Sequence, residues 1–427
     1  MKKYSVLLTI PESNTYYIRN NTQFANAFKK RGHKVITLNR NISNKELSEY
    51  VIDAKINLVI QINQPKLYSL PNDVIHICWY QDVFDEQKHI KKFINKNSII
   101  YTLGNPYKIG LGFIPSCLHK GFFTGVDKKI IFQEELKRDI DVNHIAFIPK
   151  PNAYDTNSNY VVIASTLFLY LFKLFQVIMP FKYFKKIFFI RKLLNNLPNF
   201  FSILPSKIIS IGMQKDIKQI IGIIKNNYTT LGGNLDILKI KKNIKNKYNS
   251  DYFDFLWSKY KYIVRDYPRY LDRISIGDTL VKISDSLNIF IAGYNWKLYS
   301  KYKKISHDHI ESYSQLISIY KSSKITLCNN NHGLGMHSRV LEAMACGSFI
   351  LMNESPLSNL DGGMETSFIK GVHYDEYNKD NLKEKIDYWI KNETKRLTAT
   401  KKAIEIIKNN HLWENRVDEI ISDINKL

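Results

Sequence analysis

The segment NHGLGMHSRVLEAMACGSFIL, residues 331–351, joins groups that can bind an anion to a short apolar helix. Gly333 and Gly335 lie in its loop, where glycine allows unusual backbone angles and lets a ligand approach the main chain. We expect a helix that begins near Ser338 as its N-cap and ends at Gly347, a residue suited to a left-handed cap. Free N–H groups at the start of such a helix attract anions.

Arg339 and Glu342 are three residues apart in this predicted helix and therefore share one face. A guanidinium presents a planar fork that suits phosphate oxygens. A carboxylate accepts hydrogen bonds from sugar hydroxyls, as acidic residues do for the ribose in dinucleotide sites. The pair therefore predicts a nucleotide site, with Arg339 on the diphosphate and Glu342 on the sugar. The alternative is an intrahelical salt bridge between the two side chains, with no ligand.

The elements that would position these residues form two α/β regions. Continuous apolar strands alternate with helices through the first 150 residues and again from about residue 270, which is typical of parallel sheets covered on both faces. We therefore predict an α/β fold with residues 1–150 as an N-terminal Rossmann-like domain, 151–268 as a helical insertion and 269–427 as a C-terminal Rossmann-like domain. A cleft between two such domains is a favoured place for a ligand. The predicted strands lie at 4–10, 33–38, 56–63, 73–82, 97–104, 144–149, 288–293, 324–329 and 348–353.

The insertion contains a segment with membrane-like composition. Residues 160–179 are 20 residues with Lys173 as the one charge, and about 20 helical residues cover the hydrocarbon core of a bilayer. Residues 181–194 then resemble a basic amphipathic helix of the membrane-surface type. We expect residues 160–192 either to contact an anionic membrane surface or to pack on the protein's own domains.

Composition limits the classes of protein. A chain of 427 residues with 44% hydrophobic residues has enough apolar surface for two or three domains. The formal net charge of +23 would suit nucleic acid, but the lysines are scattered, and we expect no nucleic-acid partner. The apolar run Val6–Ile10 is too short for a signal peptide. Four cysteines without a CxxC pair indicate reduced thiols, and we expect a cytoplasmic protein, peripheral at the inner membrane face if the insertion binds lipid.

The motif GLGMHSRVLEAMACGSFILMNE resembles the donor site of GT-B glycosyltransferases, in the variant of CgeB-like spore-maturation proteins. NIFIAGYNW resembles the preceding strand with its turn at Gly293, which the resemblance makes a further candidate donor contact. HICWYQDVFDE resembles a strand of the N-terminal domain that ends in an acid. The resemblance implies a GT-B fold whose C-terminal domain holds a nucleotide-sugar donor, with a glycan, lipid or protein acceptor facing the N-terminal domain. It implies a hexosyl or related transferase in polysaccharide biosynthesis or protein decoration.

By this resemblance Glu342 contacts the ribose, and Arg339 with the Gly333–Gly335 loop contacts the diphosphate. Many GT-B enzymes have a second Glu eight residues before the first, where this chain has Leu334. His332 or His337 is the candidate replacement for its contact to the transferred sugar. Two alternatives stay open, a nucleotide-sugar epimerase of the same fold and a non-catalytic membrane-associated scaffold.

Sugar transfer also needs a proton acceptor and a way to stabilise the leaving diphosphate. Asp82, which follows a predicted strand, is the candidate base for an acceptor hydroxyl, and the alternative is a helix N-cap. Glu12, in the loop after the first strand, is the second candidate. Arg273 and Lys297 are further candidate phosphate contacts, although surface charge explains either equally well. Fixed cations and helix-start N–H groups stabilise the leaving group without a metal, so we expect no metal ion and no cofactor.

Overall fold

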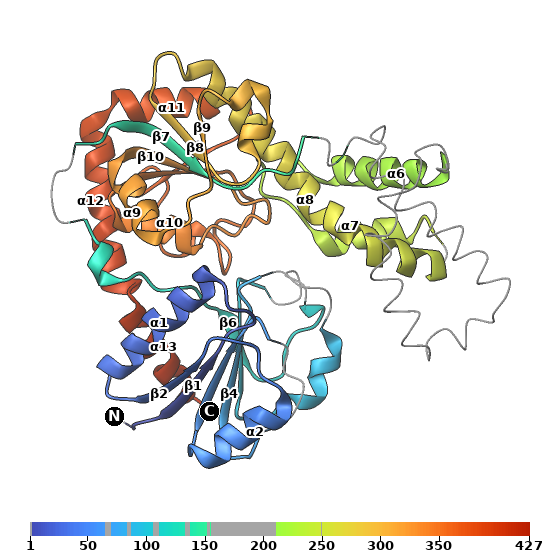
Figure 1. Ribbon diagram of the computed structural model, residues 1–427, viewed down its shortest axis with the longest axis vertical. Helices are drawn as coiled ribbons and strands as arrows, with labels where there is room; N and C mark the ends of the chain where they lie inside the picture. Colours follow the sequence, from blue (N-terminus) through green and yellow to red (C-terminus); the bar gives the residue numbers. More distant parts are fainter. Residues whose placement is uncertain are drawn as a thin grey trace.

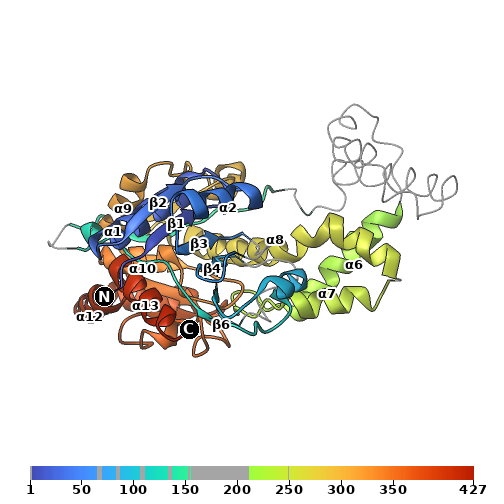
Figure 2. The same cartoon turned by 90° about the horizontal axis from the view of Figure 1, so that it is seen from below.

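The computed structural model contains two parallel β-sheets, each flanked by helices, and a group of helices that extends to one side of both (Figures 1 and 2). The residues that it describes are 2–64, 70–82, 87–105, 111–132, 137–151, 154, 211–248 and 250–427.

The first sheet has six parallel strands in the order β2-β1-β3-β4-β5-β6. Its strands are β1 (Ser5–Thr9), β2 (Lys34–Leu38), β3 (Leu58–Ile62), β4 (Ile75–Trp79), β5 (Ser98–Thr102) and β6 (Leu118–Gly121). Every residue of β3 and β5 is buried, as expected for strands covered on both faces. The helices α1 (Thr15–Lys30) and α2 (Asn44–Asp53) pack against this sheet, and Asn14 and Ser43 cap their first turns.

The second sheet has six parallel strands in the order β12-β11-β10-β7-β8-β9. Its strands are β7 (Ile140–Ile145), β8 (Ile289–Ala292), β9 (Ser306–His307), β10 (Ser323–Cys328), β11 (Phe349–Asn353) and β12 (Asp375–Tyr377). The helices of this domain are α9 (Tyr313–Ser322), α10 (Ser338–Ala345), α11 (Leu382–Lys391) and α12 (Glu393–Asn410). Short 3₁₀ segments lie at Lys88–Phe93, Lys128–Ile130, Trp296–Leu298, Ser300–Tyr302 and Met364–Thr366.

The predicted fold class is confirmed, but the domain boundaries differ from those expected at residues 150 and 269. Strand β7 pairs with β10 and β8, so the second domain begins before residue 140 rather than after 150. The terminal helix α13 (Trp413–Ile424) returns to the first domain, where Trp413 packs against Phe24 of α1. Figure 1 shows this return, with α13 beside the first sheet. Each domain is therefore completed by residues distant in the sequence.

Chain order places the functional ends of both sheets. The second sheet is doubly wound. Strands β8 and β9 are added on one side of β7, and β10 to β12 are added on the other, so the strand order reverses between β7 and β10. The first sheet reverses between β1 and β3. Ligands in open α/β sheets bind outside the carboxyl ends of the strands at such switch points. The segments that follow β1, β3, β7 and β10 are therefore the expected positions for a site.

The insertion consists of α6 (Ile211–Asn227), α7 (Ile237–Lys245) and α8 (Ser250–Ile283) in the described part, in agreement with the helices expected there. Helix α8 continues through residue 268 and enters the core of the second domain. No helix in the described ranges is long and apolar enough to cross a membrane. The membrane prediction concerns residues 160–192, which lie outside those ranges.

Two buried contacts hold the insertion together and fix it to the second domain. Asp272 of α8 accepts hydrogen bonds from the hydroxyl of Tyr228 at 2.6 Å and from the backbone N–H of Leu231 at 2.7 Å. Burial raises the pKa of Asp272 to about 6. Nearby, Gly333 lies against the backbone of Gly233, and a Cβ atom at residue 333 would overlap the Gly233 carbonyl oxygen. The loop before α10 therefore rests on the insertion.

Gly333→Ala should lower the free energy of unfolding far more than Gly371→Ala, a matched control. Both glycines have positive φ, at 74° and 77°, and a non-glycine residue in that conformation costs roughly 1–2 kcal/mol. A Cβ at Gly371 meets nothing within 4 Å, whereas one at Gly333 meets backbone. Urea unfolding should therefore show a loss of about 1 kcal/mol for Gly371→Ala and at least about 2 kcal/mol more for Gly333→Ala. Equal losses would show that the contact with Gly233 has no energetic weight.

Candidate functional site

An interdomain cleft of about 780 Å³ lies between the two domains. Its walls are the start of α1, the segment after β4, Arg269 of α8, the start of α9 with the residues before it, and the start of α10. Six residues predicted from the sequence line this interdomain cleft: Glu12, Asp82, His337, Ser338, Arg339 and Glu342.

Glu342 is almost fully buried, at 3% exposed, at the second-domain wall of the cleft. Its Oε1 accepts hydrogen bonds from Nη2 of Arg19 at 3.1 Å and from the hydroxyl of Tyr313 at 3.2 Å. Its Oε2 is buried and has no hydrogen-bond partner in the described structure. Burial raises the pKa of Glu342, and Arg19 acts in the opposite direction. One oxygen of this carboxylate is thus held in place while the other can accept a hydrogen bond.

Arg339 does not pair with Glu342. Its Nη1 donates instead to the carbonyl oxygen of Ile145, 2.8 Å away at the carboxyl end of β7. The alternative of an intrahelical salt bridge therefore does not hold in this structure. The guanidinium of Arg339 is exposed at the switch point of the second sheet, where the topology places a ligand.

Ser338 was predicted as the N-cap of helix α10, but it is the first helical residue, and His337 occupies the N-cap position. His337 has the extended backbone of the cap position but makes no capping hydrogen bond with its side chain. Val340 and Leu341 donate the first bonds, both to the carbonyl of His337, so the N–H groups of Ser338 and Arg339 precede the hydrogen-bonded turns. Cys346 is the C-cap and Gly347, with φ of 79°, follows it as predicted.

The positive charge near the start of α10 comes from arginines and not from His337. Burial, assisted by Arg339, lowers the pKa of His337 to about 4, so this imidazole is neutral near pH 7. Arg269 of α8 also lines the cleft, with Nη1 3.1 Å from Asp266. Arg273, one turn further along α8, lies behind the cleft wall, where it donates to the carbonyl of Phe147. Burial, together with Arg269 and Arg339, lowers the pKa of Arg273 to about 9.

Three glycines predicted to contact the donor are placed outside the lining of the cleft. A Cβ at Gly335 would overlap Met364, and one at Gly293 would overlap the carbonyl of Ala146. With Gly333 against the insertion, these positions need glycine for close packing. In this structure the glycine loop before α10 therefore packs against the protein itself, on Gly233 and Met364, and does not line the cleft.

His332 and Lys297 also lie outside the lining of the cleft. The backbone N–H of His332 donates to Oδ1 of Asn330 at 3.0 Å, and burial lowers the pKa of the His332 imidazole to about 3. Lys297 pairs with exposed Asp308 at 2.6 Å, which matches the interpretation of Lys297 as surface charge.

Asp82 lies on the first-domain wall, after β4. Its Oδ2 accepts hydrogen bonds from the hydroxyl of Tyr17 at 3.0 Å and from Nδ2 of Asn63 at 2.6 Å. Asn63 follows β3, so this group sits at the switch point of the first sheet. Glu12, in the loop after β1, is exposed and accepts a hydrogen bond from the side chain of Asn14 at 2.5 Å. The N-cap alternative for Asp82 concerns residues 83–86, which are outside the described ranges.

Sequence reasoning missed Arg19, Tyr16 and Tyr313. The guanidinium carbon of Arg19 lies 3.9 Å from the ring centroid of Tyr313 and 5.5 Å from that of Tyr16. The hydroxyl of Tyr16 approaches Oγ of Ser338 at 3.4 Å. Burial raises the pKa of Tyr16, and the charges of Glu342 and Asp82 raise it further. No periodic pattern marks these residues, because their contacts cross between domains.

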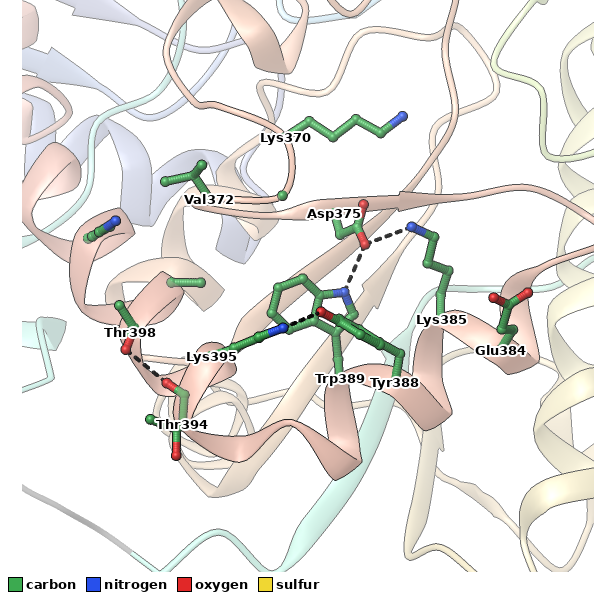
Figure 3. Close-up of a pocket in the computed structure, with 13 residues that line it drawn as sticks. Lys370, Val372, Asp375, Glu384, Lys385, Tyr388, Trp389, Thr394, Lys395 and Thr398 are labelled. Carbon is green, nitrogen blue, oxygen red and sulfur yellow. Dashed lines mark hydrogen bonds and ion pairs between the residues drawn. The ribbon is translucent and has the colours of Figure 1, made fainter.

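A second cavity, of about 830 Å³, lies on the second domain between β12, α11 and α12 (Figure 3). Several of its polar groups bind one another. Asp375 accepts hydrogen bonds from Lys385 at 2.9 Å and Trp389 at 2.8 Å, and Lys395 donates to the hydroxyl of Tyr388 at 3.1 Å. No residue predicted for the site lines it. In the described ranges no group of three or more His, Cys, Asp or Glu could hold a metal ion.

Comparison with known proteins agrees with this architecture. Residues 277–422, about a third of the chain, match the family described as "Glycosyl transferase-like". HepE from Anabaena, solved in complex with UDP-glucose, is 10% identical with a TM-score of 0.50, over 99% of this chain and 100% of that one. A glycosyltransferase from Rickettsia africae ESF-5 is 11% identical with a TM-score of 0.48, over 100% and 99%. No curated protein matches the chain. The chain thus has the two-domain GT-B fold, and its second domain contains a glycosyl transferase-like region.

Proposed function

We propose that this protein is a glycosyltransferase that binds a nucleotide sugar in the interdomain cleft and moves the sugar to a glycan, lipid or protein acceptor. The observation that carries the proposal is the buried Oε2 of Glu342, which has no partner in the described structure. A buried carboxylate oxygen without a hydrogen bond is costly, and a hydroxyl from a ligand would remove that cost. The ribose of a nucleotide supplies two adjacent hydroxyls.

The arginines beside Glu342 suit the remainder of such a donor. Arg339 and Arg269 line the same cleft, and the first N–H groups of α10 lie at its wall. A diphosphate placed there would meet two fixed cations and the positive end of a helix. As the bond between the sugar and the diphosphate breaks, these groups would stabilise the negative charge on the leaving group.

Asp82 is the proposed base on the opposite wall. Tyr17 and Asn63 hold its Oδ2, while Oδ1 has no partner among the described residues. In the transfer, the acceptor oxygen bonds to the anomeric carbon and its proton passes to Asp82. The electrons of the broken bond leave with the diphosphate. Glu12, exposed on the same wall, is the second candidate for this role.

Several finer features remain part of the proposal. HepE binds UDP-glucose in its crystal structure, so UDP-sugars are the first donors to test. We also keep the CgeB-like subtype, the hexosyl class of donor and a cytoplasmic position beside an anionic membrane as proposals. The last of these depends on residues 160–192. An acceptor in cell-surface polysaccharide synthesis would fit that position.

Glu342→Ala should weaken nucleotide-sugar binding by roughly 100-fold, because a hydrogen bond to a charged group contributes about 1.5–3 kcal/mol. A panel of UDP-, GDP- and dTDP-sugars screened by thermal shift would first identify the donor, and calorimetry would then compare the variants. Glu384→Ala, an exposed carboxylate on α11, is the matched control and should bind normally. Equal affinity of wild type and Glu342→Ala would remove the donor assignment. Interconversion of two sugars would instead favour an epimerase, and no binding at all a scaffold.

Asp82→Asn should lower kcat roughly 100-fold or more while donor affinity stays within about twofold, because a general base acts in the chemical step. The control is Asp73→Asn, which should leave kcat unchanged. Asp73 is exposed and precedes the first residue of β4, at the end of the strand opposite to Asp82. The measurement is donor turnover with acceptor present, by release of the nucleotide diphosphate. A kcat of Asp82→Asn equal to that of wild type would exclude Asp82 as the base and move the assignment to Glu12.

A further inference from the structure

Arg19 joins the two domains at the candidate donor site. It belongs to α1 of the first domain, and its Nη2 lies 3.1 Å from Oε1 of Glu342 in α10 of the second. The side chain of Arg19 is 18% exposed and that of Glu342 is 4% exposed. Among the described residues, Glu342 forms no ion pair other than this one. The carboxylate that we assign to the ribose therefore depends on a cation from the other domain.

Aromatic rings enclose this ion pair. The guanidinium of Arg19 stacks on Tyr313 of α9 and lies near Tyr16 of its own helix. The same Tyr313 donates a hydrogen bond to Oε1 of Glu342. Because the pair is mostly buried, the attraction between the two charges is stronger than at a protein surface. Removing one partner from such a pair is also more costly, since it leaves a buried charge alone.

We propose that Arg19 is a positioning residue that links donor binding to the arrangement of the two domains, by holding Oε1 of Glu342 and leaving Oε2 for the donor. This inference rests on the proposed function. When the domains are close, Glu342 has its counter-charge and is ready to accept sugar hydroxyls. When they separate, Glu342 loses Arg19 and its affinity for a diol falls. Donor binding and domain closure must then favour each other, because coupling between two equilibria is reciprocal.

The charges around Glu342 determine how this link depends on pH. Burial raises its pKa, and Arg19 is the largest influence that lowers it, ahead of Tyr313 and Arg339. Without Arg19 the pKa of Glu342 should rise further, so more of the carboxyl is protonated at pH 6 than at pH 8. The titratable or charged side chains that face Glu342 are Arg19 and Tyr16 from α1, Tyr313 and Tyr320 from α9, Arg339 from α10 and Cys346 after it.

The test compares Arg19→Gln and Arg19→Lys with wild type by calorimetry at pH 6 and pH 8. The probe is UDP-glucose, or the UDP-, GDP- or dTDP-sugar that gives the largest thermal shift with wild type. We expect Arg19→Gln to bind at least tenfold more weakly at pH 6 and to recover part of that loss at pH 8. Arg19→Lys keeps the charge without the planar fork and should be intermediate at pH 6.

Arg31→Gln is the matched control. Arg31 caps the end of α1 and pairs with Asp418 of α13, outside the lining of the cleft, so donor affinity should match that of wild type at both pH values. Small-angle scattering supplies a second measurement. Donor should reduce the radius of gyration of wild type and Arg31→Gln but not of Arg19→Gln. If Arg19→Gln does not fold, the affinity of Arg19→Lys at pH 6 is the test. Weaker binding than wild type supports the role of Arg19, and equal binding overturns it.

Failure of this inference and failure of the proposed function give different results. Wild-type affinity and donor-dependent compaction in both Arg19 variants, together with lost binding in Glu342→Ala, would overturn the role of Arg19 and leave the donor site in place. Absence of nucleotide-sugar binding by wild type across the whole panel would reject the proposed function, and the role of Arg19 with it.

Discussion

The central constraint in this protein is a buried carboxylate with one oxygen hydrogen-bonded and the other without a partner in the described structure. Glu342 is 3% exposed, and burial raises the free energy of its charged form. Arg19 and Tyr313 stabilise Oε1, while Oε2 has no partner in the described structure. A group of this kind is costly unless a ligand completes its hydrogen bonds. The adjacent arginines and helix start would favour a ligand that carries both hydroxyls and negative charge.

The fold brings these groups together through strand order. Arg339 reaches the carboxyl end of β7, and α10 follows β10, so both lie at the switch point of the second sheet. Asn63 and Asp82 lie at the corresponding end of the first sheet. The two switch points face each other across the interdomain cleft, and Tyr16 belongs to its lining. A donor on one wall and an acceptor on the other is therefore an arrangement that the topology itself favours.

Local patterns predicted much of this structure. Continuous apolar runs marked most strands, and the Gly347 cap marked the end of α10. A strand was predicted at 144–149, but the observed strand β7 spans Ile140–Ile145. The prediction missed its first residues because several of them are polar. Asn143 is buried nevertheless, since its Nδ2 donates to Thr326, which is distant in the sequence. A hydrophobicity pattern cannot detect a polar residue that a distant partner satisfies.

The site was harder to predict for the same reason. Arg339 and Glu342 share a helix, so their spacing identified them, whereas Arg19 is 323 residues from Glu342 and carries no local signal. Gly333 has the backbone conformation that suggested a ligand loop, but the residue against it is Gly233 of the insertion. A glycine pattern shows that something comes close to the main chain, and only the tertiary structure shows whether it is a ligand or the protein.

A crystal structure of the protein with UDP would show whether Glu342 binds the ribose of a nucleotide. We expect a ribose hydroxyl within hydrogen-bond distance of Oε2 of Glu342, with the diphosphate beside Arg339 at the start of α10. Nucleotide bound elsewhere, such as in the cavity of Figure 3, with Oε2 still unpartnered, would contradict it.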